Sequence, residues 1–213
     1  QNKHNTVNNF DNTKVFTHAF EGYGQQKSYA ANLPTHDMIL SLDADESLDE
    51  EAIAEIQNLK RNGFDELYLI KRKTFYCGHW VKYCGWYPDK KLRLWNRIHA
   101  NLSLDKLHET VLPNNPHAPT QLLKGNILHY SYKTTQDHLN QLDRFSTMAA
   151  KKYFDQGKKS FLFQAQWSYV IKFLEVYIYK LGILDGKTGF TIALLSAYGQ
   201  FLKYHKLHLL NRS

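Results

Sequence analysis

The stretch Met38-Ile39-Leu40-Ser41-Leu42-Asp43-Ala44-Asp45-Glu46 decides how this chain is interpreted. Its first half is a short apolar run bounded by polar residues, which predicts a buried strand of a parallel sheet. Ligands of open α/β sheets bind outside the carboxyl ends of such strands, which is where Asp43 and Asp45 follow. Alternation along a strand places both carboxylates on one face, where they repel unless a cation or hydrogen-bond donors compensate. The stretch thus favours a site in which a divalent cation binds a phosphorylated substrate.

The acidic stretch is open to two other interpretations. A solvated acidic turn that opens the next helix is equally compatible with these residues, because Asp, Ser and Glu are also capping residues. A calcium-binding loop of the EF-hand type is rejected, since Leu48 stands where the sharp turn needs glycine.

The patterns along the chain predict α/β structure up to about residue 130 and helices after it. Ser47 and Glu50 match a capping box, and Gly63 follows as a helix stop. Strand patterns lie at Leu67–Ile70, Lys91–Trp95 and Ile127–Tyr130. Helical patterns lie at Leu139–Tyr153, Phe161–Tyr179 and Gly189–Tyr204. We expect residues 1–132 to form a catalytic domain and residues 133–213 a helical region packed on it.

Composition limits the class of protein. The chain has 213 residues, of which 43% are hydrophobic and 22% charged, so it is globular rather than disordered. Its two cysteines, Cys77 and Cys84, fit no zinc pattern, and two thiols in a reducing compartment are favoured over a disulfide. Neither a signal peptide nor a confident membrane span is recognisable, so a cytoplasmic location is expected.

The positive charge lies in the last third of the chain. Residues 1–150 hold 17 Lys and Arg against 17 Asp and Glu, whereas residues 151–213 hold 10 against 3. The same segment holds 13 of the 30 aromatic residues. Basic and aromatic residues together suit an anionic membrane surface. The competing interpretation is aromatic packing beneath solvated lysines, and a nucleic-acid partner is not expected.

Three residues beyond the acidic stretch are candidates for the chemistry. Glu109, after His108, is a candidate general base, although these two residues alone favour a surface Glu beside a surface His. Arg93 suits a diphosphate because a guanidinium matches phosphate oxygens, and otherwise faces solvent. His129 is a candidate metal ligand or a satisfied core histidine.

A loop dense in aromatic residues offers a sugar-binding surface. Trp80, Tyr83, Trp86 and Tyr87 occur there together with glycines, and aromatic faces pack against the apolar faces of sugars. An aromatic plug of the core is the alternative.

Taken together, these residues resemble glycosyltransferase family 2, the inverting GT-A enzymes, and within it the branch of lipopolysaccharide core biosynthesis. The resemblance covers nearly the whole chain from about Lys14. The segments that carry it are Gly24–Lys27, Leu40–Glu46, Tyr87–Asp89, Leu92–Leu94, His108-Glu109, Leu123–Gly125, His129–Tyr132 and Gly182–Gly189.

The resemblance implies a fold and a set of donor-binding residues. The fold is α/β, with a GT-A-like (Rossmann-like) mixed sheet flanked by helices and a C-terminal helical region. Asp43 would contact the nucleotide, and Asp45 would hold Mg²⁺ or Mn²⁺ on the donor diphosphate. Lys27 and Arg93 would neutralise phosphate charge, and His129 would complete the metal shell.

The resemblance also implies how the acceptor reacts. Glu109 would act as the base, while Trp86 and Tyr87 would contact the acceptor. The implied reaction is inverting transfer of a sugar from a nucleotide-sugar donor, UDP-linked, to a lipopolysaccharide core or related lipid-linked oligosaccharide. The enzyme would be cytoplasmic and peripheral at the inner-membrane face, with contact to anionic lipid.

One departure from the family is visible in the sequence. The family opens with a strand and a Thr-Tyr-Asn-Glu-like motif, followed by an Asp-Ser-Gly-Ser-like segment, and neither is present. We therefore expect the catalytic domain to lack the N-terminal βαβ unit. The alternative to an enzyme is a non-catalytic module of the same fold that binds glycans or a membrane surface.

Overall fold

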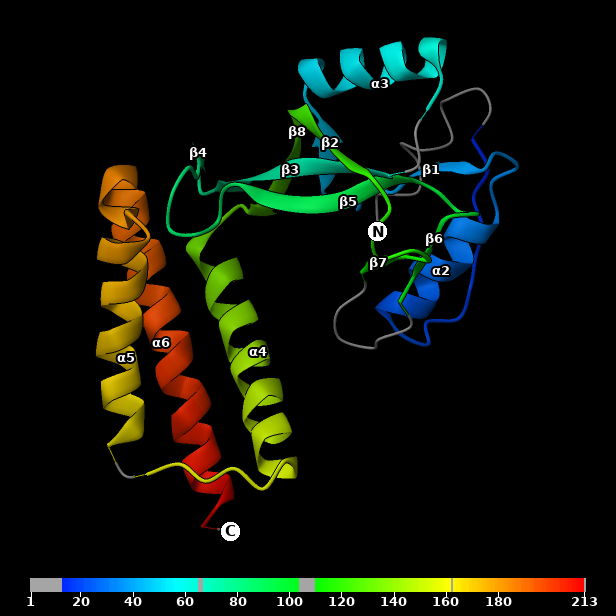
Figure 1. Ribbon diagram of the computed structural model, residues 1–213. Helices are drawn as coiled ribbons and strands as arrows, with labels where there is room; N and C mark the ends of the chain where they lie inside the picture. Colours follow the sequence, from blue (N-terminus) through cyan, green and yellow to red (C-terminus); the bar gives the residue numbers. More distant parts are fainter. Residues whose placement is uncertain (1–12, 65–66, 104–109, 162, 213) are drawn as a thin grey trace.

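The computed structural model describes residues 13–64, 67–103, 110–161 and 163–212, and its centre is a mixed β-sheet (Figure 1). The strands of this sheet are β1 (Met38–Leu40), β2 (Glu46–Leu48), β3 (Leu67–Tyr76), β4 (His79–Trp80), β5 (Asp89–Asn96) and β8 (Thr120–Tyr132). Their order is β1-β5-β3-β8-β2, with β4 paired to β3. The pair β3–β8 is parallel, and the other pairs of this sheet are antiparallel.

Helices and a small second sheet cover the two faces of the mixed sheet. On one face, α3 (Glu50–Asn62) contributes Ile56 and Leu59 to a core with Tyr68 and Ile70. On the other, α2 (Tyr23–Asn32) and the two-stranded sheet of β6 (Ala100–Leu102) and β7 (Val111–Pro113) pack around buried Trp95. This arrangement, followed by C-terminal helices, confirms the predicted α/β GT-A-like fold class.

The apolar run at Met38 forms a strand, but not the buried parallel strand that its composition predicts. It pairs antiparallel with β5 at the end of the strand order, and only Ile39 of the three residues is buried. An apolar run records that one face is covered but does not record which strand lies beside it. The prediction of a parallel neighbour was therefore wrong.

The residues Asp43 to Glu46 form a tight turn, not the end of an extended strand. The backbone N–H of Glu46 donates to the carbonyl of Asp43 at 2.9 Å, and the Glu46 carboxylate accepts from the N–H of Asp43 at 3.0 Å. The strict alternation that would place Asp43 and Asp45 on one face is thereby lost. The turn leads directly into β2, so the interpretation as an acidic turn was correct about the local backbone.

The helix that follows starts two residues later than the capping box predicts. Ser47 lies inside β2, and Asp49 is the N-cap of α3, its side chain accepting from the N–H of Ala52 at 2.9 Å. Strand pairing with β8 holds the chain extended through Leu48, which prevents Ser47 from capping. Gly63 ends the helix as expected, with a positive φ of 101°.

Close packing of α3 on β8 depends on Gly125. A Cβ atom at this position would overlap the backbone of Ala52. The pairing of β3 with β8 shifts register here, and the N–H groups of Lys124 and Gly125 donate to the carboxylate of Glu55 instead, at 3.2 and 2.9 Å. Glu55 of α3 thus accepts hydrogen bonds from backbone N–H groups that the irregular strand pairing leaves without a partner.

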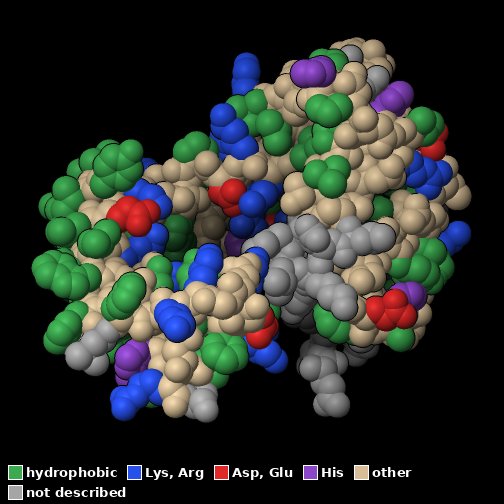
Figure 2. All heavy atoms as spheres, turned by 60° about the horizontal axis from the view of Figure 1, so that its bottom comes forward, with side chains coloured by type: hydrophobic (Ala, Val, Ile, Leu, Met, Phe, Trp, Pro, Cys, Tyr) green, Lys and Arg blue, Asp and Glu red, His purple; other side chains and the backbone are tan. Residues whose placement is uncertain are grey.

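Three long helices extend from one end of the sheet (Figure 1). They are α4 (Thr135–Asp155), α5 (Gln164–Leu174), which continues as the π-helical turn η1 (Glu175–Tyr179), and α6 (Gly186–Leu210), preceded by the 3₁₀ turn η2 (Gly182–Asp185). The surface is hollowed between this bundle and the sheet (Figure 2). Within residues 13–212 as described, no helix is both long and apolar enough to cross a membrane.

Two buried polar contacts join the bundle to the sheet region. The carboxylate of Asp185 accepts from the N–H groups of Lys82 and Tyr83, the latter at 2.8 Å. The hydroxyl of Tyr76 lies 3.1 Å from Nδ1 of His138, among the rings of Trp86 and Tyr132. The bundle is therefore fixed to the aromatic loop and to β3 by satisfied, buried groups.

Candidate active site

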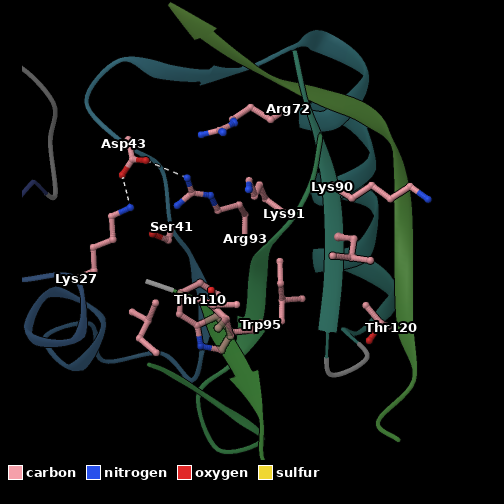
Figure 3. A pocket seen from close by; sticks show the side chains of 14 residues that line it. Lys27, Ser41, Asp43, Arg72, Lys90, Lys91, Arg93, Trp95, Thr110 and Thr120 are labelled. Atoms are coloured by element: carbon pink, nitrogen blue, oxygen red, sulfur yellow. Dashed lines mark hydrogen bonds and ion pairs between the residues drawn. The ribbon is translucent and has the colours of Figure 1, made fainter. Parts of the chain in front are cut away.

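Three residues selected from the sequence, Lys27, Asp43 and Arg93, meet at a cavity of about 500 Å³ (Figure 3). Lys27 comes from α2, Asp43 from the turn after β1, and Arg93 from β5. The Asp43 carboxylate lies 2.7 Å from Nζ of Lys27 and 2.9 Å from Nη2 of Arg93. Burial raises the pKa of Asp43, but the two cations outweigh it and hold that pKa below its usual 3.8. Asp43 is therefore ionised at neutral pH.

Glu46, the last residue of the acidic stretch, contacts two arginines that line this cavity. Its side chain is 0% exposed, and Oε1 lies 3.1 Å from Arg93 and 3.5 Å from Arg72. Arg72, on β3, also donates to Asp89 from Nη2 at 2.7 Å, because the two residues are register partners across β3 and β5. A buried carboxylate thus orients two guanidinium groups toward the cavity.

Positive charge is in slight excess in this network. Among the described residues, ion pairs join four cationic side chains, those of Lys27, Arg72, Lys91 and Arg93, to the three carboxylates of Asp43, Glu46 and Asp89. One net positive charge in a partly enclosed cavity attracts an anion, and guanidinium groups match phosphate oxygens. The cavity therefore has the electrostatic character of a phosphate-binding site.

Asp45 and His129, predicted as metal ligands, lie together: Asp45 directly precedes β2, and His129 is on β8. Pairing of β2 with β8 sets Glu46 opposite His129, so that Oδ2 of Asp45 lies 3.3 Å from Nε2 of His129. Burial and the nearby Arg72 hold the pKa of His129 below its usual 6.5. The imidazole is therefore neutral at pH 7, as a metal ligand must be.

Asp45 and His129 fit a cation only when other ligands complete its coordination. Among the described residues, no group of three or more His, Cys, Asp and Glu side chains is arranged to hold a metal ion. The exposed Asp45 carboxylate and the neutral His129 supply two donors, and Mg²⁺ is commonly bound by one or two carboxylates together with substrate phosphates. The pair thus fits a cation shared with a diphosphate.

A second cavity, of about 520 Å³, lies between the sheet and α4. Trp86, His129 and Arg72 line it, with Gln141 contributed by α4. Tyr87, predicted beside Trp86 as an acceptor contact, instead donates its hydroxyl to Asn126 at 3.0 Å and lines neither cavity. Trp86 packs edge-on against Tyr76, so it belongs partly to the core and partly to the cavity wall.

The predicted base, Glu109, lies outside the described residues, as does His108. Thr110, which follows Glu109 in the sequence, lines the first cavity. Sequence reasoning missed Arg72, which is hidden in the basic run Lys71–Lys73, and assigned no role to Asp89, although Asp89 belongs to a segment that carries the resemblance. The period-two alternation of β3 was the available signal, since it separates Arg72 from its two lysine neighbours.

The fold and the two adjoining cavities define an α/β protein equipped to bind an anionic ligand beside a polar one. No family model matches the chain. It is 28% identical to an uncharacterised glycosyltransferase of Rickettsia typhi over 207 residues, which are 93% of this chain and 71% of the relative. It is 29% identical to one of Rickettsia prowazekii over 203 residues, 91% of this chain and 70% of the relative.

A further relative is named for its pathway. The chain is 26% identical to the lipopolysaccharide core biosynthesis glycosyltransferase LpsC of Rhizobium meliloti over 200 residues, 89% of this chain and 70% of the relative. The resemblance to glycosyltransferases, including the lipopolysaccharide core branch, is thereby confirmed. These relatives support a glycosyltransferase function in general terms.

Proposed function

We propose that this chain transfers a sugar, with inversion, from a UDP-linked donor to a lipopolysaccharide core or related lipid-linked oligosaccharide. The observation that carries the proposal is the set of Lys27, Arg93 and Arg72 around Asp43 in one cavity, next to the Asp45–His129 pair. This set offers fixed positive charge for a diphosphate, with a place for its counter-cation beside it.

Donor binding is assigned to the first cavity. Arg93 and Lys27 would contact diphosphate oxygens, and Asp43 would accept hydrogen bonds from the nucleotide. Asp45 and His129 would hold Mg²⁺ or Mn²⁺ there. When bound, the cation neutralises charge on the leaving diphosphate. Arg72 and Arg93 are already held by the buried Glu46 carboxylate, so they need little reorganisation as negative charge develops on the diphosphate.

Acceptor activation is assigned to Glu109 and the second cavity. Trp86 would stack on the acceptor sugar in that cavity, and Tyr87, which lines neither cavity, would contact the part of the acceptor that extends beyond it. An acceptor hydroxyl oxygen forms the new bond to the anomeric carbon while the bond to the diphosphate oxygen breaks. The hydroxyl proton passes to the Glu109 carboxylate. A single displacement of this kind inverts the anomeric configuration.

A lipid-linked acceptor requires the protein to work at a membrane. We therefore assign it a peripheral position on the cytoplasmic face of the inner membrane, in contact with anionic lipid. The predominance of Lys and Arg over Asp and Glu in residues 151–213 supports this assignment.

The donor assignment is tested by calorimetric titration of UDP with Mn²⁺ and with EDTA. We expect binding that needs the metal and that Asp45→Asn abolishes. Asp37→Asn is the matched control, because the Asp37 side chain is exposed and pairs with Arg97, which does not line the first cavity. Equal binding in EDTA, or an unaffected Asp45→Asn variant, would refute the metal site. If the wild type does not bind UDP, the result would favour a non-catalytic binding module.

The catalytic assignment needs a second variant. Glu109→Gln should abolish sugar transfer while leaving UDP binding unchanged. Retained turnover would remove Glu109 from the role of base.

A further inference from the structure

The outward face of α5 and η1 carries an exposed apolar stripe. We use this name for Trp167, Ile171, Leu174 and Ile178, which are 67%, 62%, 51% and 54% exposed. Their spacing of three and four residues places them in one row along the helix. Soluble proteins normally bury such a row, so its exposure needs a reason.

The core of the bundle does not need the apolar stripe. The opposite side of the same segment supplies the packing residues, with Phe173 and Tyr177 against Phe190 of α6 and Val176 buried. The segment is therefore apolar on both sides, one side toward α6 and one toward solvent. Figure 1 shows α5 as the outermost helix, on the side of the bundle away from α4.

Further exposed apolar residues continue the surface at both ends of the stripe. They are Phe161 and Phe163 before α5, and Tyr179, Leu181, Ile183 and Leu184 around the turn into α6. Figure 2 shows hydrophobic side chains gathered along the outer edge of the helical region. The face combines aliphatic residues with Trp and Tyr, the two residue types enriched where a membrane meets water.

Charge identifies what this face would meet. Residues 156–213 contain eight Lys and Arg but only two acidic residues, Glu175 and Asp185. Asp185 is buried, and Glu175 is paired with Lys172 at 2.9 Å and Lys180 at 2.6 Å. Lys158, Lys159 and Lys187 are exposed at the two ends of the stripe. An apolar surface bordered by exposed lysines is complementary to anionic lipid headgroups over an apolar interior.

We propose that the apolar stripe is the membrane-docking surface of this protein, with α5 lying in the interface of an anionic bilayer. The proposal rests on the proposed function in placing the acceptor at a membrane, and it names the surface that makes the contact. Trp167, Ile171, Leu174 and Ile178 enter the headgroup boundary, and the flanking lysines remain at the level of the phosphates.

The test is co-flotation of the whole chain with vesicles of phosphatidylcholine, with and without phosphatidylglycerol. Wild type should float with the anionic vesicles and much less with the neutral ones, and added salt should weaken its binding. The double variant Ile171→Gln, Ile178→Gln should bind at least ~10-fold more weakly. The matched control is Phe145→Gln, Met148→Gln on α4, where two similarly exposed apolar residues are changed.

Several outcomes would overturn the proposal. These are wild type that floats with neither vesicle, a stripe variant that binds like wild type, and a control variant that loses as much binding as the stripe variant. A wild-type dimer in light scattering that the stripe variant dissociates would assign the stripe to a second copy of the chain instead.

The donor site and the docking surface are tested separately. Arg93→Gln should bind vesicles as wild type does, whatever its effect on UDP. Vesicle binding without metal-dependent UDP binding would therefore refute the donor site and leave the docking surface standing. Thermal unfolding of each variant confirms that it is folded.

Discussion

Oε1 of Glu46 lies 3.1 Å from Nη2 of Arg93, and the carboxylate that holds this guanidinium has no solvent-exposed surface. A buried charge is tolerated only when it is paired, and here one carboxylate faces both Arg93 and Arg72. Glu46 is thus a supporting residue whose loss reaches the site through the two arginines.

Glu46→Gln should reduce the stability of the chain and weaken UDP binding together. Removing one partner of a buried ion pair typically costs about 3–5 kcal/mol, because the remaining charges lose their compensation. Urea unfolding measures the stability and titration measures the affinity. Glu51→Gln, in the first turn of α3, is the exposed control. A stable Glu46→Gln variant with normal UDP binding would contradict the supporting role.

Arg93 should contribute directly to donor affinity. Arg93→Lys keeps the positive charge but loses the planar fork, and we expect UDP to bind about tenfold more weakly or worse, since charged hydrogen bonds contribute roughly 1.5–3 kcal/mol. Arg97→Lys is the matched control at the exposed end of the same segment, where Arg97 pairs with Asp37. Equal losses in both variants would show that the effect is not specific to the cavity.

His129 should affect the metal dependence more than the fold. Its Nδ1 is buried without a hydrogen-bond partner among the described residues, and Nε2 faces Asp45. His129→Gln should raise the Mn²⁺ concentration needed for half-maximal UDP binding by about tenfold or more. His79→Gln, on β4, should leave the Mn²⁺ requirement unchanged. An unaltered requirement in His129→Gln would limit the metal site to Asp45.

Acid should destabilise the contact between α4 and the sheet through His138. Burial lowers the pKa of His138 from 6.5 to about 4, so between these values the unfolded chain binds a proton that the folded chain does not. Stability contributed by the neutral ring is complete above pH 6.5 and is lost as the pH falls toward 4, by up to about 3 kcal/mol.

The measurement is urea unfolding at several pH values between these limits. His138→Gln should flatten the pH dependence of the unfolding free energy, whereas His117→Gln, which changes an exposed histidine of the loop after β7, should preserve it. A His138→Gln variant with the wild-type pH slope would place the acid sensitivity elsewhere.

Gly125→Ala should separate α3 from β8. The added methyl group would overlap the Ala52 backbone, which cannot move as a side chain can, and overpacking of this kind costs about 1–3 kcal/mol or more. Gly199→Ala is a sharp control, because the atom nearest to its new methyl group is the flexible tip of the Leu142 side chain, not backbone. Unfolding midpoints should fall strongly for the first variant and little for the second.

The sequence predicted the individual strands and helices better than it predicted which strands pair with one another. The apolar run at Met38, the helix stop at Gly63 and the strand at Lys91–Trp95 lie where their patterns indicate. The pairing of β1 with β5 was not predictable, because an apolar run reports burial and not the direction of the adjacent strand. Likewise, Ser47 and Asp49 are both good N-caps, and only the pairing of β2 with β8 selects the second.

In the candidate site, too, individual residues were predictable from the sequence, but their arrangement in space was not. Lys27, Asp43 and Arg93 are each predictable from the sequence, and the structure brings Lys27 and Arg93 within hydrogen-bonding distance of Asp43. The function of Glu46 as an anchor was not recognisable, because its burial results from three strands that come together in space. Glu109 as base and the metal ion remain predictions.

Arg72 lines the first cavity and the second, and it touches Glu46 and Asp89. One side chain is therefore shared between the two proposed ligand positions. If donor binding reorients this guanidinium, the affinity for the acceptor changes by some factor, and acceptor binding must change donor affinity by the same factor. An acceptor sugar measured against the empty protein would then report a different affinity from one measured with the nucleotide in place.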